Sequence, residues 1–161
     1  MRIHEIFEND AEHAETLKQT GFWGTAGAGC IIFSRNTGRF LIQYRSRYVE
    51  QPNTYGTWGG AIDRGDSPEA TVMKEVKEES GYTGKVKLHP IYVFQKGDFK
   101  YYNFIAEVED EFEPNLNWEA EGYKWVEYGE WPEPLHFGIQ AILNDGKSVS
   151  VMKSLVKRQR Q

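Results

Sequence analysis

Three glutamates stand close together in a segment that reads as a helix, residues 68–80. Glu75, Glu78 and Glu79 are spaced at i, i+3 and i+4, so a helix would place their carboxylates on one face. Like charges this close destabilise a helix slightly unless a cation lies among them, and hard carboxylate oxygens suit Mg²⁺ or Mn²⁺ better than zinc. A solvated acidic face partnered by neighbouring lysines would show the same three residues, so the spacing by itself leaves both interpretations open.

The approach to this helix favours the metal interpretation. The loop that ends at Asp66 contains several glycines, which let main-chain carbonyls approach a metal ion and let a phosphate chain lie against the backbone. Ser67 fits an N-cap, Pro68 is tolerated at the first helical position, and Gly81 follows the expected end. The sequence therefore predicts a helix with defined ends beside a glycine-containing loop.

The segment from Gly60 to Tyr82 resembles the Nudix box, the signature of the MutT-like Nudix hydrolase family. The signature reads glycine, five residues, glutamate, seven residues, Arg-Glu, an aliphatic residue, any residue, Glu-Glu, any residue, glycine and a hydrophobic residue. This chain keeps every interval, but Asp66 stands for the first glutamate and Lys74 for the arginine. Lysine keeps the charge and loses the two-pronged geometry of a guanidinium. Upstream, Trp58 stands where many members have proline.

The resemblance implies a role for each matching position. Glu75 and Glu79 would bind metal directly, and Glu78 would bind metal and help to activate the attacking water. The main-chain carbonyl of Gly59 would add a metal ligand. Lys74 and Asp66 would together orient the glutamates. Acids cluster in such a site because metal ions must bridge the diphosphate and lower the pKa of water, whereas bare carboxylates would repel the substrate.

A further metal ligand is expected from the stretch 107–133, which holds ten acids and a single base. Members of the family often recruit an acid from the loop before the Trp-Val strand, where this chain has Glu119 and Glu121. Glu119 is the better candidate, because Trp118 can anchor the loop, whereas the backbone beside Gly122 is freer. The alternative is that both acids face solvent.

Substrate contacts are expected from arginines and aromatic rings. Arg45 and Arg47 follow the second predicted strand and are placed to meet phosphate, for which a guanidinium offers paired donors. Nucleobases are commonly held by aromatic stacking, and we select Tyr55 and Trp58 as candidates. The chain has 23 aromatic residues, so each ring is individually more typical of core or surface. Other rings that stay open are Trp23, Tyr48, Tyr101, Tyr102 and Trp118.

The elements that position these residues follow from hydrophobic periodicity and turn residues. Strands are predicted at 30–33, 39–44, 85–88, 91–95, 101–108 and 123–126, and helices at 10–19, 68–80 and 135–143, with a loop over 45–65. Such a mixture indicates an α/β fold with helices packed on a central sheet. The resemblance sharpens this to a Nudix-type α/β/α sandwich with a mixed β-sheet, as a single domain over 1–161 with the box at 60–82.

Composition restricts the class of protein. A chain of 161 residues with 39% hydrophobic and 27% charged residues suits one folded domain. Cys30 is the only cysteine, which suits a reducing compartment, and neither a signal peptide nor an apolar run of about 20 residues is seen. The basic residues near the C-terminus are too few for a nucleic-acid patch. We therefore expect a cytoplasmic protein whose partner is a small nucleotide, not a membrane or a nucleic acid, with a homodimer left open.

The resemblance implies that the chain uses Mg²⁺ or Mn²⁺ to hydrolyse the diphosphate linkage of a nucleoside diphosphate joined to another group. Nucleoside triphosphates, sugar nucleotides and dinucleoside polyphosphates stay open, whereas Gly97 stands where ADP-ribose-specific members carry proline. A catalytically weak nucleotide-binding module is the alternative, although such modules generally lose a box glutamate. An isopentenyl-diphosphate isomerase would need an active-site cysteine, but Cys30 lies in a predicted core strand.

Overall fold

The sheet is built around β1 (Ala26–Ser34), in which eight consecutive residues are buried. β1 runs parallel to β6 (Phe99–Val108) and antiparallel to β2 (Phe40–Arg45) and β4 (Trp58–Ala61). A strand with neighbours on both sides and helices over both faces needs small or apolar residues throughout, and the segment AGAGCIIFS supplies them.

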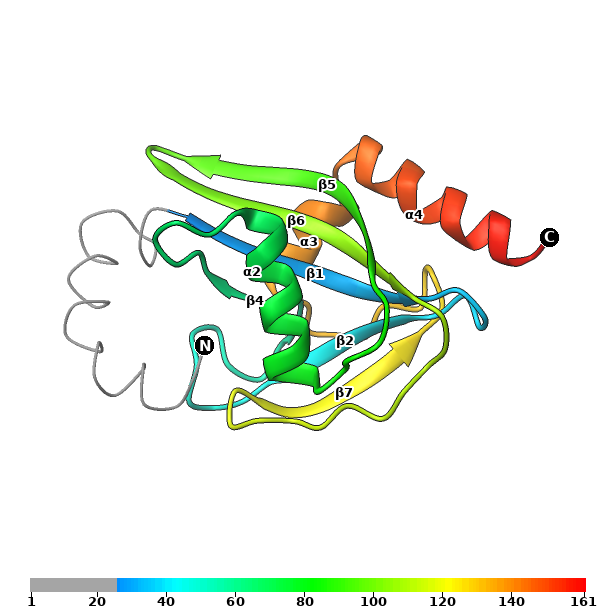
Figure 1. Cartoon of the computed structure of the whole chain (residues 1–161), viewed down its shortest axis with the longest axis horizontal. Coiled ribbons are helices and arrows are strands. Elements are labelled where there is room, and N and C mark those ends of the chain that lie inside the picture. The colour runs from blue at the N-terminus through cyan, green and yellow to red at the C-terminus, as the bar shows by residue number, and fades with distance from the viewer. Residues whose placement is uncertain (1–25) are drawn as a thin grey trace.

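Three more strands complete a mixed sheet of seven strands, in the order β3-β2-β1-β6-β5 with β4 also on β1 and β7 on β2 (Figure 1). β5 (Lys87–Lys96) pairs antiparallel with β6, while β3 (Tyr55–Gly56) and β7 (Ala120–Val126) pair antiparallel with β2. The computed structural model describes residues 26–161, so the helix expected at 10–19 lies outside the described residues.

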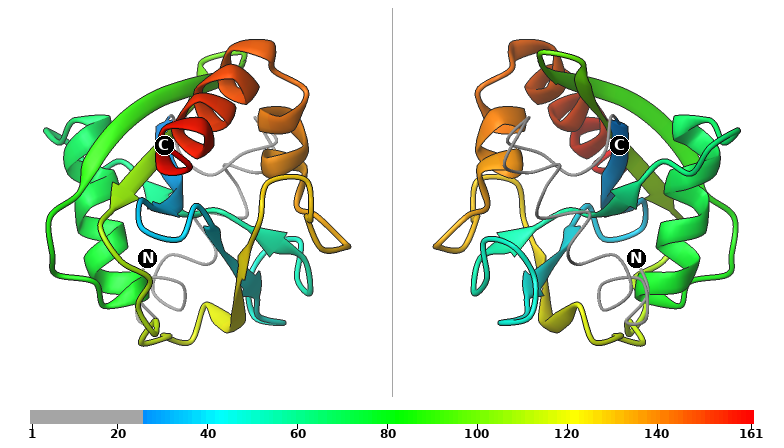
Figure 2. Two further views of the ribbon diagram at one scale, coloured as in Figure 1. Left: turned by 90° about the vertical axis from the view of Figure 1, so that its right-hand side faces the viewer. Right: turned by 90° about the vertical axis from the view of Figure 1, so that its left-hand side faces the viewer.

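Helices cover both faces of the sheet. α2 (Pro68–Glu75) and the π-helical turn η1 (Val76–Ser80) lie on one face, and α3 (Phe137–Leu143) and α4 (Gly146–Gln159) lie on the other (Figure 2). This is the α/β/α sandwich with a mixed sheet that the sequence predicted, so the fold class is confirmed. Within residues 26–161, none of the helices combines the length and the apolar character that crossing a bilayer requires.

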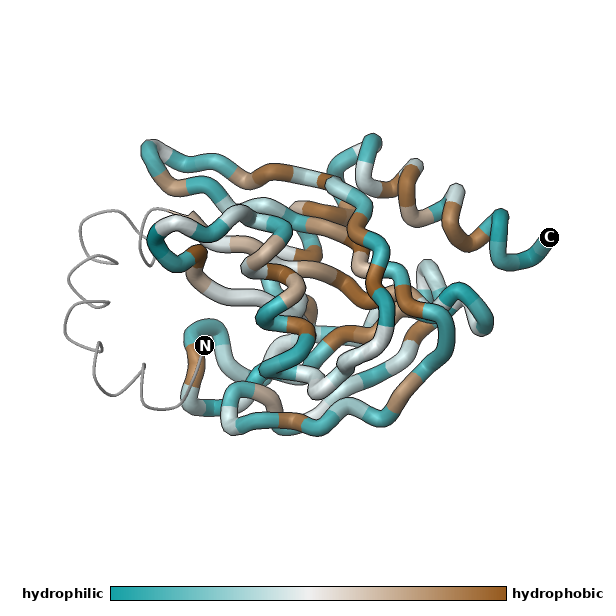
Figure 3. The backbone as a smooth tube through the Cα atoms, in the orientation of Figure 1, coloured by the Kyte–Doolittle hydropathy of each residue, from teal (hydrophilic) through white to brown (hydrophobic). Residues whose placement is uncertain are grey.

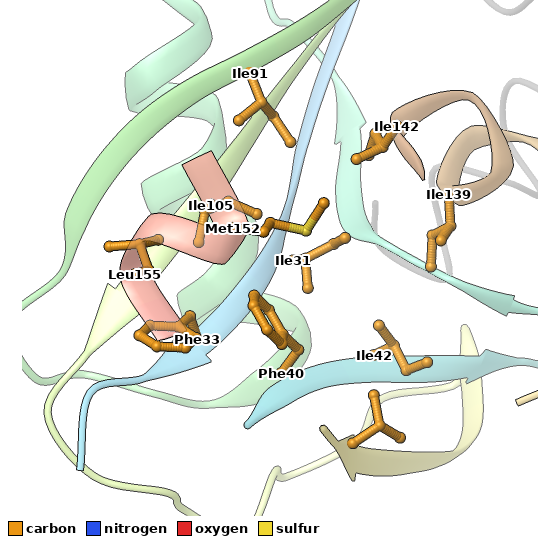
Figure 4. Packing of buried hydrophobic residues seen from close by; sticks show 11 residues of the cluster. Ile31, Phe33, Phe40, Ile42, Ile91, Ile105, Ile139, Ile142, Met152 and Leu155 are labelled. Carbon is orange, nitrogen blue, oxygen red and sulfur yellow. The ribbon is translucent and has the colours of Figure 1, made fainter. Parts of the chain in front are cut away.

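Each helix layer has its own hydrophobic core. Val72 and Val76 pack beneath α2 and η1 in a cluster that includes Cys30, which is completely buried. On the opposite face, Ile139 of α3 and Met152 of α4 pack against the sheet (Figure 4). Because burial of one such side chain contributes roughly 1.5–3 kcal/mol, these contacts fix both layers and hold the acidic helix in place.

The structure differs from the sequence-based expectation at three places, which are α4, the loop 45–65 and β5. The pattern does not reveal α4, because basic residues dominate its last turn, yet its Met152 and Leu155 are buried. Figure 3 shows hydrophobic and hydrophilic stretches alternating along this helix. The predicted loop 45–65 contains β3 and β4; two of the four β4 residues are glycines, and this low-propensity segment becomes a strand because β1 supplies its ladder. The strands expected at 85–88 and 91–95 form one strand, β5.

Candidate active site

The helix that carries the three glutamates has the predicted ends. Ser67 Oγ accepts a hydrogen bond from the Ala70 N–H at 3.0 Å, which caps α2, and Gly81 follows η1 in the left-handed region with φ 78°. The second half of the segment winds as a π-helical turn, a feature frequent at functional sites. Within this turn Glu79 is 1% exposed, whereas Glu78 is half-buried.

Glu79 is held by donors from the sheet. Its Oε1 accepts from the Gly59 N–H in β4 at 3.0 Å, and its Oε2 accepts from Gln43 Nε2 in β2 at 3.2 Å. Glu75 is also buried and lies against Gly60, where an added Cβ would stand 2.8 Å from Glu75 Oε1. Gly60 therefore lets the Glu75 carboxylate approach the β4 backbone, which a larger residue at this position would prevent.

Glu119 meets these two carboxylates from the chain just before β7, and the three together are called the acid cluster below. Burial, followed by the charges of Glu119 and Glu75, raises the pKa of Glu79 well above its usual range. Burial also raises the pKa of Glu119 to about 7, and the charge of Glu75 adds to this. Glu121, by contrast, is exposed and accepts from the Arg47 N–H at 3.4 Å. Crowded buried anions of this kind favour a cation among them.

Lys74 pairs with Asp63 rather than with the acid that opens the box. Lys74 Nζ lies 2.7 Å from Asp63 Oδ2, while Asp66 is exposed and its main-chain N–H bonds to the Asp63 carbonyl. Lys74 thus pairs with Asp63, because the turn at 63–66 presents this aspartate to the helix, and the expectation that Lys74 and Asp66 together orient the glutamates stays a prediction. The pairing with Asp63 raises the pKa of Lys74, and the charges of Glu78 and Glu75 add to it.

Tyr101 of β6 covers the glycines of β1 and β4. A Cβ at Gly27 would stand 2.8 Å from the Tyr101 ring, and a Cβ at Gly29 or Gly59 would collide with its hydroxyl. Burial raises the pKa of the Tyr101 hydroxyl, and the charge of Glu79 adds to this. The phenol therefore stays protonated and lies as a neutral group beside the acid cluster.

A cavity of about 500 Å³ opens next to the acid cluster, within the range typical of ligand sites. What we call its acidic side contains Gly59, Gly60 and Glu119. What we call its aromatic side consists of Phe94, Phe99 and Phe137, which come from β5, β6 and α3. One cavity thus offers a cation-binding side and a side suited to a planar apolar group.

Arg45 and His136 both flank Gly56 in the cavity wall, since a Cβ there would lie 3.1 Å from Arg45 Cδ and 3.5 Å from His136 Cβ. Arg45 Nε and Nη2 donate to the Glu50 carbonyl at 2.9 and 2.5 Å. Burial, helped by the charge of Arg45, lowers the pKa of His136 to about 3. Its Nδ1 accepts from the Gly138 N–H at 3.0 Å, so the neutral ring carries its proton on Nε2. The wall therefore combines a fixed cation with a neutral donor.

The aromatic side is held together by edge-to-face contacts. The Phe94 ring lies 6.5 Å from that of Phe99 and 6.2 Å from that of Phe137, measured between centroids. Phe137 stacks on His136 at 4.5 Å and is itself 40% exposed. Asn103 adds a buried amide, whose Nδ2 donates to a β5 carbonyl at 3.0 Å. This side can receive a flat ring and offers it few directional contacts.

The chain is similar to a known protein family. The model described as "NUDIX domain" matches residues 24–145, which is most of the chain. The chain belongs to the Nudix family. The family membership expected from the box is therefore confirmed, and the Nudix helix is the segment α2–η1 described above.

The Nudix relatives are distant in sequence. A Mycobacterium tuberculosis protein that carries the provisional name 8-oxo-dGTP diphosphatase 3 is 26% identical over 132 residues, covering 74% of this chain and 61% of that protein. The chain thus spans about three fifths of the length of the curated relatives it matches. RenU, a Nudix hydrolase from M. smegmatis, superimposes with a TM-score of 0.70 at 22% identity, covering 81% of this chain and 88% of RenU. The MutT NUDIX hydrolase from Burkholderia pseudomallei superimposes with a TM-score of 0.59 at 21% identity, covering 76% of this chain and 99% of that protein. At these identities, the likeness to solved structures concerns the fold.

The Nudix fold implies a divalent metal, and the donor set fits one. All candidate ligands are oxygens, and the buried carboxylates repel one another until a cation neutralises them. Within residues 26–161, no group of three or more Asp, Glu, His or Cys side chains already encloses a position for an ion. Each oxygen of Glu79 accepts one hydrogen bond, from Gly59 or from Gln43, and keeps a further lone pair, so this carboxylate can bind a metal while both donors hold it.

Two of the aromatic residues predicted to contact substrate lie elsewhere. Trp58 is completely buried and donates from Nε1 to the Leu41 carbonyl at 3.1 Å, so its prediction is wrong. In β4 the cavity is lined by Gly59, Gly60 and Ala61, which follow Trp58 in the strand. Tyr55 packs on Tyr44 at 4.8 Å between centroids and lies outside the lining that the described residues form.

The two arginines also separate. Arg45 lines the cavity, whereas Arg47 is exposed, and its guanidinium lies 5.1 Å from the Tyr48 ring centroid. Gln43 and His136 also line the cavity and were not predicted from the sequence. A polar residue within the apolar strand FLIQYR was the available signal for Gln43; His136 had none, because only folding brings it to the cavity.

Proposed function

We propose that the chain is a metal-dependent pyrophosphohydrolase that cleaves the diphosphate linkage of a nucleoside diphosphate joined to another group. The observation that carries this proposal is that one cavity is lined both by Glu119 of the acid cluster and by the three phenylalanines. Carboxylates suit a cation with its phosphate, and apolar rings suit a base. A nucleotide is the small molecule that has both parts.

In this proposal the metal lies among the carboxylates. Glu75, Glu79 and Glu119 would hold Mg²⁺ or Mn²⁺, with Glu78 as a fourth carboxylate and the Gly59 carbonyl as the ligand expected from the box. When bound, such ions neutralise the charge of the diphosphate and lower the pKa of the attacking water. The cluster is therefore suited to hydrolysis only when it is loaded with cations.

The other residues of the site bind substrate and move a proton. Arg45 and the Nε2–H of His136 would donate to phosphate oxygens, and the ring of Phe94 would contact the base. Glu78 is half-buried, so its carboxylate is accessible to the attacking water and would accept its proton. Lys74 would keep a positive charge beside the helix glutamates.

Candidate substrates follow from the chemistry and from the relatives. The name of the M. tuberculosis relative adds 8-oxo-dGTP to the nucleoside triphosphates, sugar nucleotides and dinucleoside polyphosphates expected from the box. The cytoplasmic location, the single domain over 1–161 and the homodimer considered from the sequence stay predictions.

A nucleotide screen with metal-free protein tests the proposal. We expect hydrolysis of at least one nucleotide to require added Mg²⁺ or Mn²⁺, with products identified by chromatography. Glu78→Gln should lower kcat by about 10²–10³, as expected for one preorganised electrostatic partner, whereas the exposed Glu121→Gln should leave it unchanged. Full activity in chelator contradicts the proposal, and tight nucleotide binding without turnover favours a binding module.

A further inference from the structure

Gln43 of β2 stands between the acid cluster and the cavity, and the proposed function gives it no role. Its side chain is 3% exposed and lines the cavity. Nε2 donates to the Thr57 carbonyl at 2.7 Å and to Glu79 Oε2 at 3.2 Å. Both partners are acceptors, which fixes the orientation of the amide, since a flipped amide would set its oxygen against two other oxygens.

The amide oxygen of Gln43, unlike its nitrogen, makes no hydrogen bond to the described residues. Within residues 26–161, Oε1 of Gln43 is buried and has no hydrogen-bond partner. A buried amide oxygen in this condition has lost its hydration without compensation, which costs free energy. Buried polar side-chain atoms are usually paired, and Gln43 is a residue of the cavity lining, so its unpaired oxygen points to a donor that arrives with a ligand.

We propose that Gln43 is a positioning residue whose Oε1 accepts a hydrogen bond from a water in the hydration shell of the cation bound at Glu79. This inference rests on the proposed function. Phosphate oxygens are acceptors and cannot satisfy Oε1, whereas Mg²⁺ usually keeps several waters, each a donor about 2.1 Å from the ion. Because Nε2 of the same amide already bonds Glu79, a cation on that carboxylate brings such a water within reach of Oε1.

One amide then holds a metal ligand with its nitrogen and a metal-bound water with its oxygen. Residues that bond the ligands rather than the ion fix ligand orientation, and their loss typically weakens metal binding about 10–100-fold. The competing source of a donor is the nucleoside, for example a sugar hydroxyl. Gln43 bonds directly to Glu79 of the acid cluster, which favours a donor that comes with the cation.

Mn²⁺ binding to the whole chain without substrate tests this inference. Gln43→Leu removes both amide contacts at similar size, and we expect the Mn²⁺ dissociation constant to rise about 10–100-fold, measured by electron paramagnetic resonance of free Mn²⁺. Water-proton relaxation by the bound ion should change as well, because a held water is released. Asn103→Leu is the matched control, a buried amide of the same cavity with its own β5 partner, and should bind Mn²⁺ as the wild type does.

Gln43→Met, with chelator-treated melting curves for every variant, separates metal binding from misfolding. Unchanged Mn²⁺ affinity and relaxation in folded Gln43 variants overturn the inference. A raised KM for the nucleotide with unchanged Mn²⁺ binding also overturns it and assigns the donor to the substrate. Failure of the wild-type chain to bind Mn²⁺ overturns the proposed function itself. If the wild type binds Mn²⁺ and turns over a nucleotide, and the Gln43 variants behave in the same way, only the role of Gln43 is overturned.

Discussion

The acidic side of the cavity is fixed by hydrogen bonds, whereas the aromatic side is held by ring packing. Glu79 is anchored to β4 and β2 by two donors of fixed direction. The phenylalanine rings meet edge to face, and Phe137 is 40% exposed. Directional contacts demand one chemistry, while apolar rings tolerate related flat groups. We therefore expect the acidic side to control kcat and the aromatic side to control KM and substrate choice.

The largest expected effect is on the acidic side. Glu79→Gln keeps the size of the side chain and removes a buried charge, so kcat should fall by about 10²–10³ with little change in KM. Steady-state kinetics at saturating Mg²⁺ measures this, with the exposed Glu121→Gln as the matched control. A kcat close to that of the wild type would show that the acid cluster is not the reaction centre.

A smaller effect is expected on the aromatic side. Phe94→Ala removes the ring that contacts both Phe99 and Phe137, and KM should rise about 10–100-fold, since stacking contributes about 1–3 kcal/mol per base. Here kcat should change little. Tyr48→Ala, 63% exposed and outside the cavity lining, is the control. Loss of kcat without a change in KM would remove the distinction between the two sides.

The next prediction concerns stability against pH in chelator. Burial raises the pKa of Glu119 from its ordinary 4.5 to about 7, so the folded state binds this proton more tightly than the unfolded state. The wild type should therefore lose stability relative to Glu119→Gln as pH rises from about 4.5 to about 7, by on the order of 1–2 kcal/mol. Urea unfolding at several pH values measures the difference.

The stability of the wild type is compared with that of Glu119→Gln because His136 also changes stability with pH. Its pKa is lowered to about 3, so its own contribution to stability grows as pH rises toward 6.5, opposite to that of Glu119. The imidazole is present in both proteins and cancels in the comparison. Saturating Mg²⁺ should abolish the trend, because the cation neutralises the acid cluster; a pH-independent difference in chelator would contradict the buried charge.

The smallest effect is expected at the surface, outside both sides of the cavity. Lys74 and Asp63 are partly exposed, and such pairs contribute below about 1 kcal/mol. A double-mutant cycle of Lys74→Met with Asp63→Asn should show coupling in the free energy of unfolding, whereas the cycle with Asp66→Asn should be additive. Coupling of Lys74 to Asp66 but not to Asp63 would contradict the ion pair between Lys74 and Asp63.

The parts of the site that the sequence predicted are local in the chain. The helix with Glu75, Glu78 and Glu79 follows from a spacing of a few residues, and its cap at Ser67 follows from a single residue type. Glu119 could be narrowed to one of two acids, because a loop next to a strand limits the choices. Its burial beside Glu79 required the β2–β7 pairing, which no local pattern specifies.

The parts that escaped prediction depend on which strands pair. The burial of Trp58 is one such part. The two glycines of β4 hide the strand in the sequence, so nothing there indicates that the Trp58 side chain points into the core. Phe94, Phe99 and Phe137 come together only when α3 packs near the β5–β6 hairpin. Their individual positions in the sequence carry no sign of a shared cavity.

The parallel pairing of β1 with β6 also bears on how the chain folds during synthesis. Cys30 lies opposite Phe104, 74 positions later, so the acidic helix leaves the ribosome before β1 has its parallel partner β6. Closing so long a loop costs chain entropy, and parallel pairing of distant strands is slow. Until then β1 keeps an apolar edge open to other chains, the condition in which chaperones are needed. The nascent chain therefore cannot complete its site in the order in which it is synthesised.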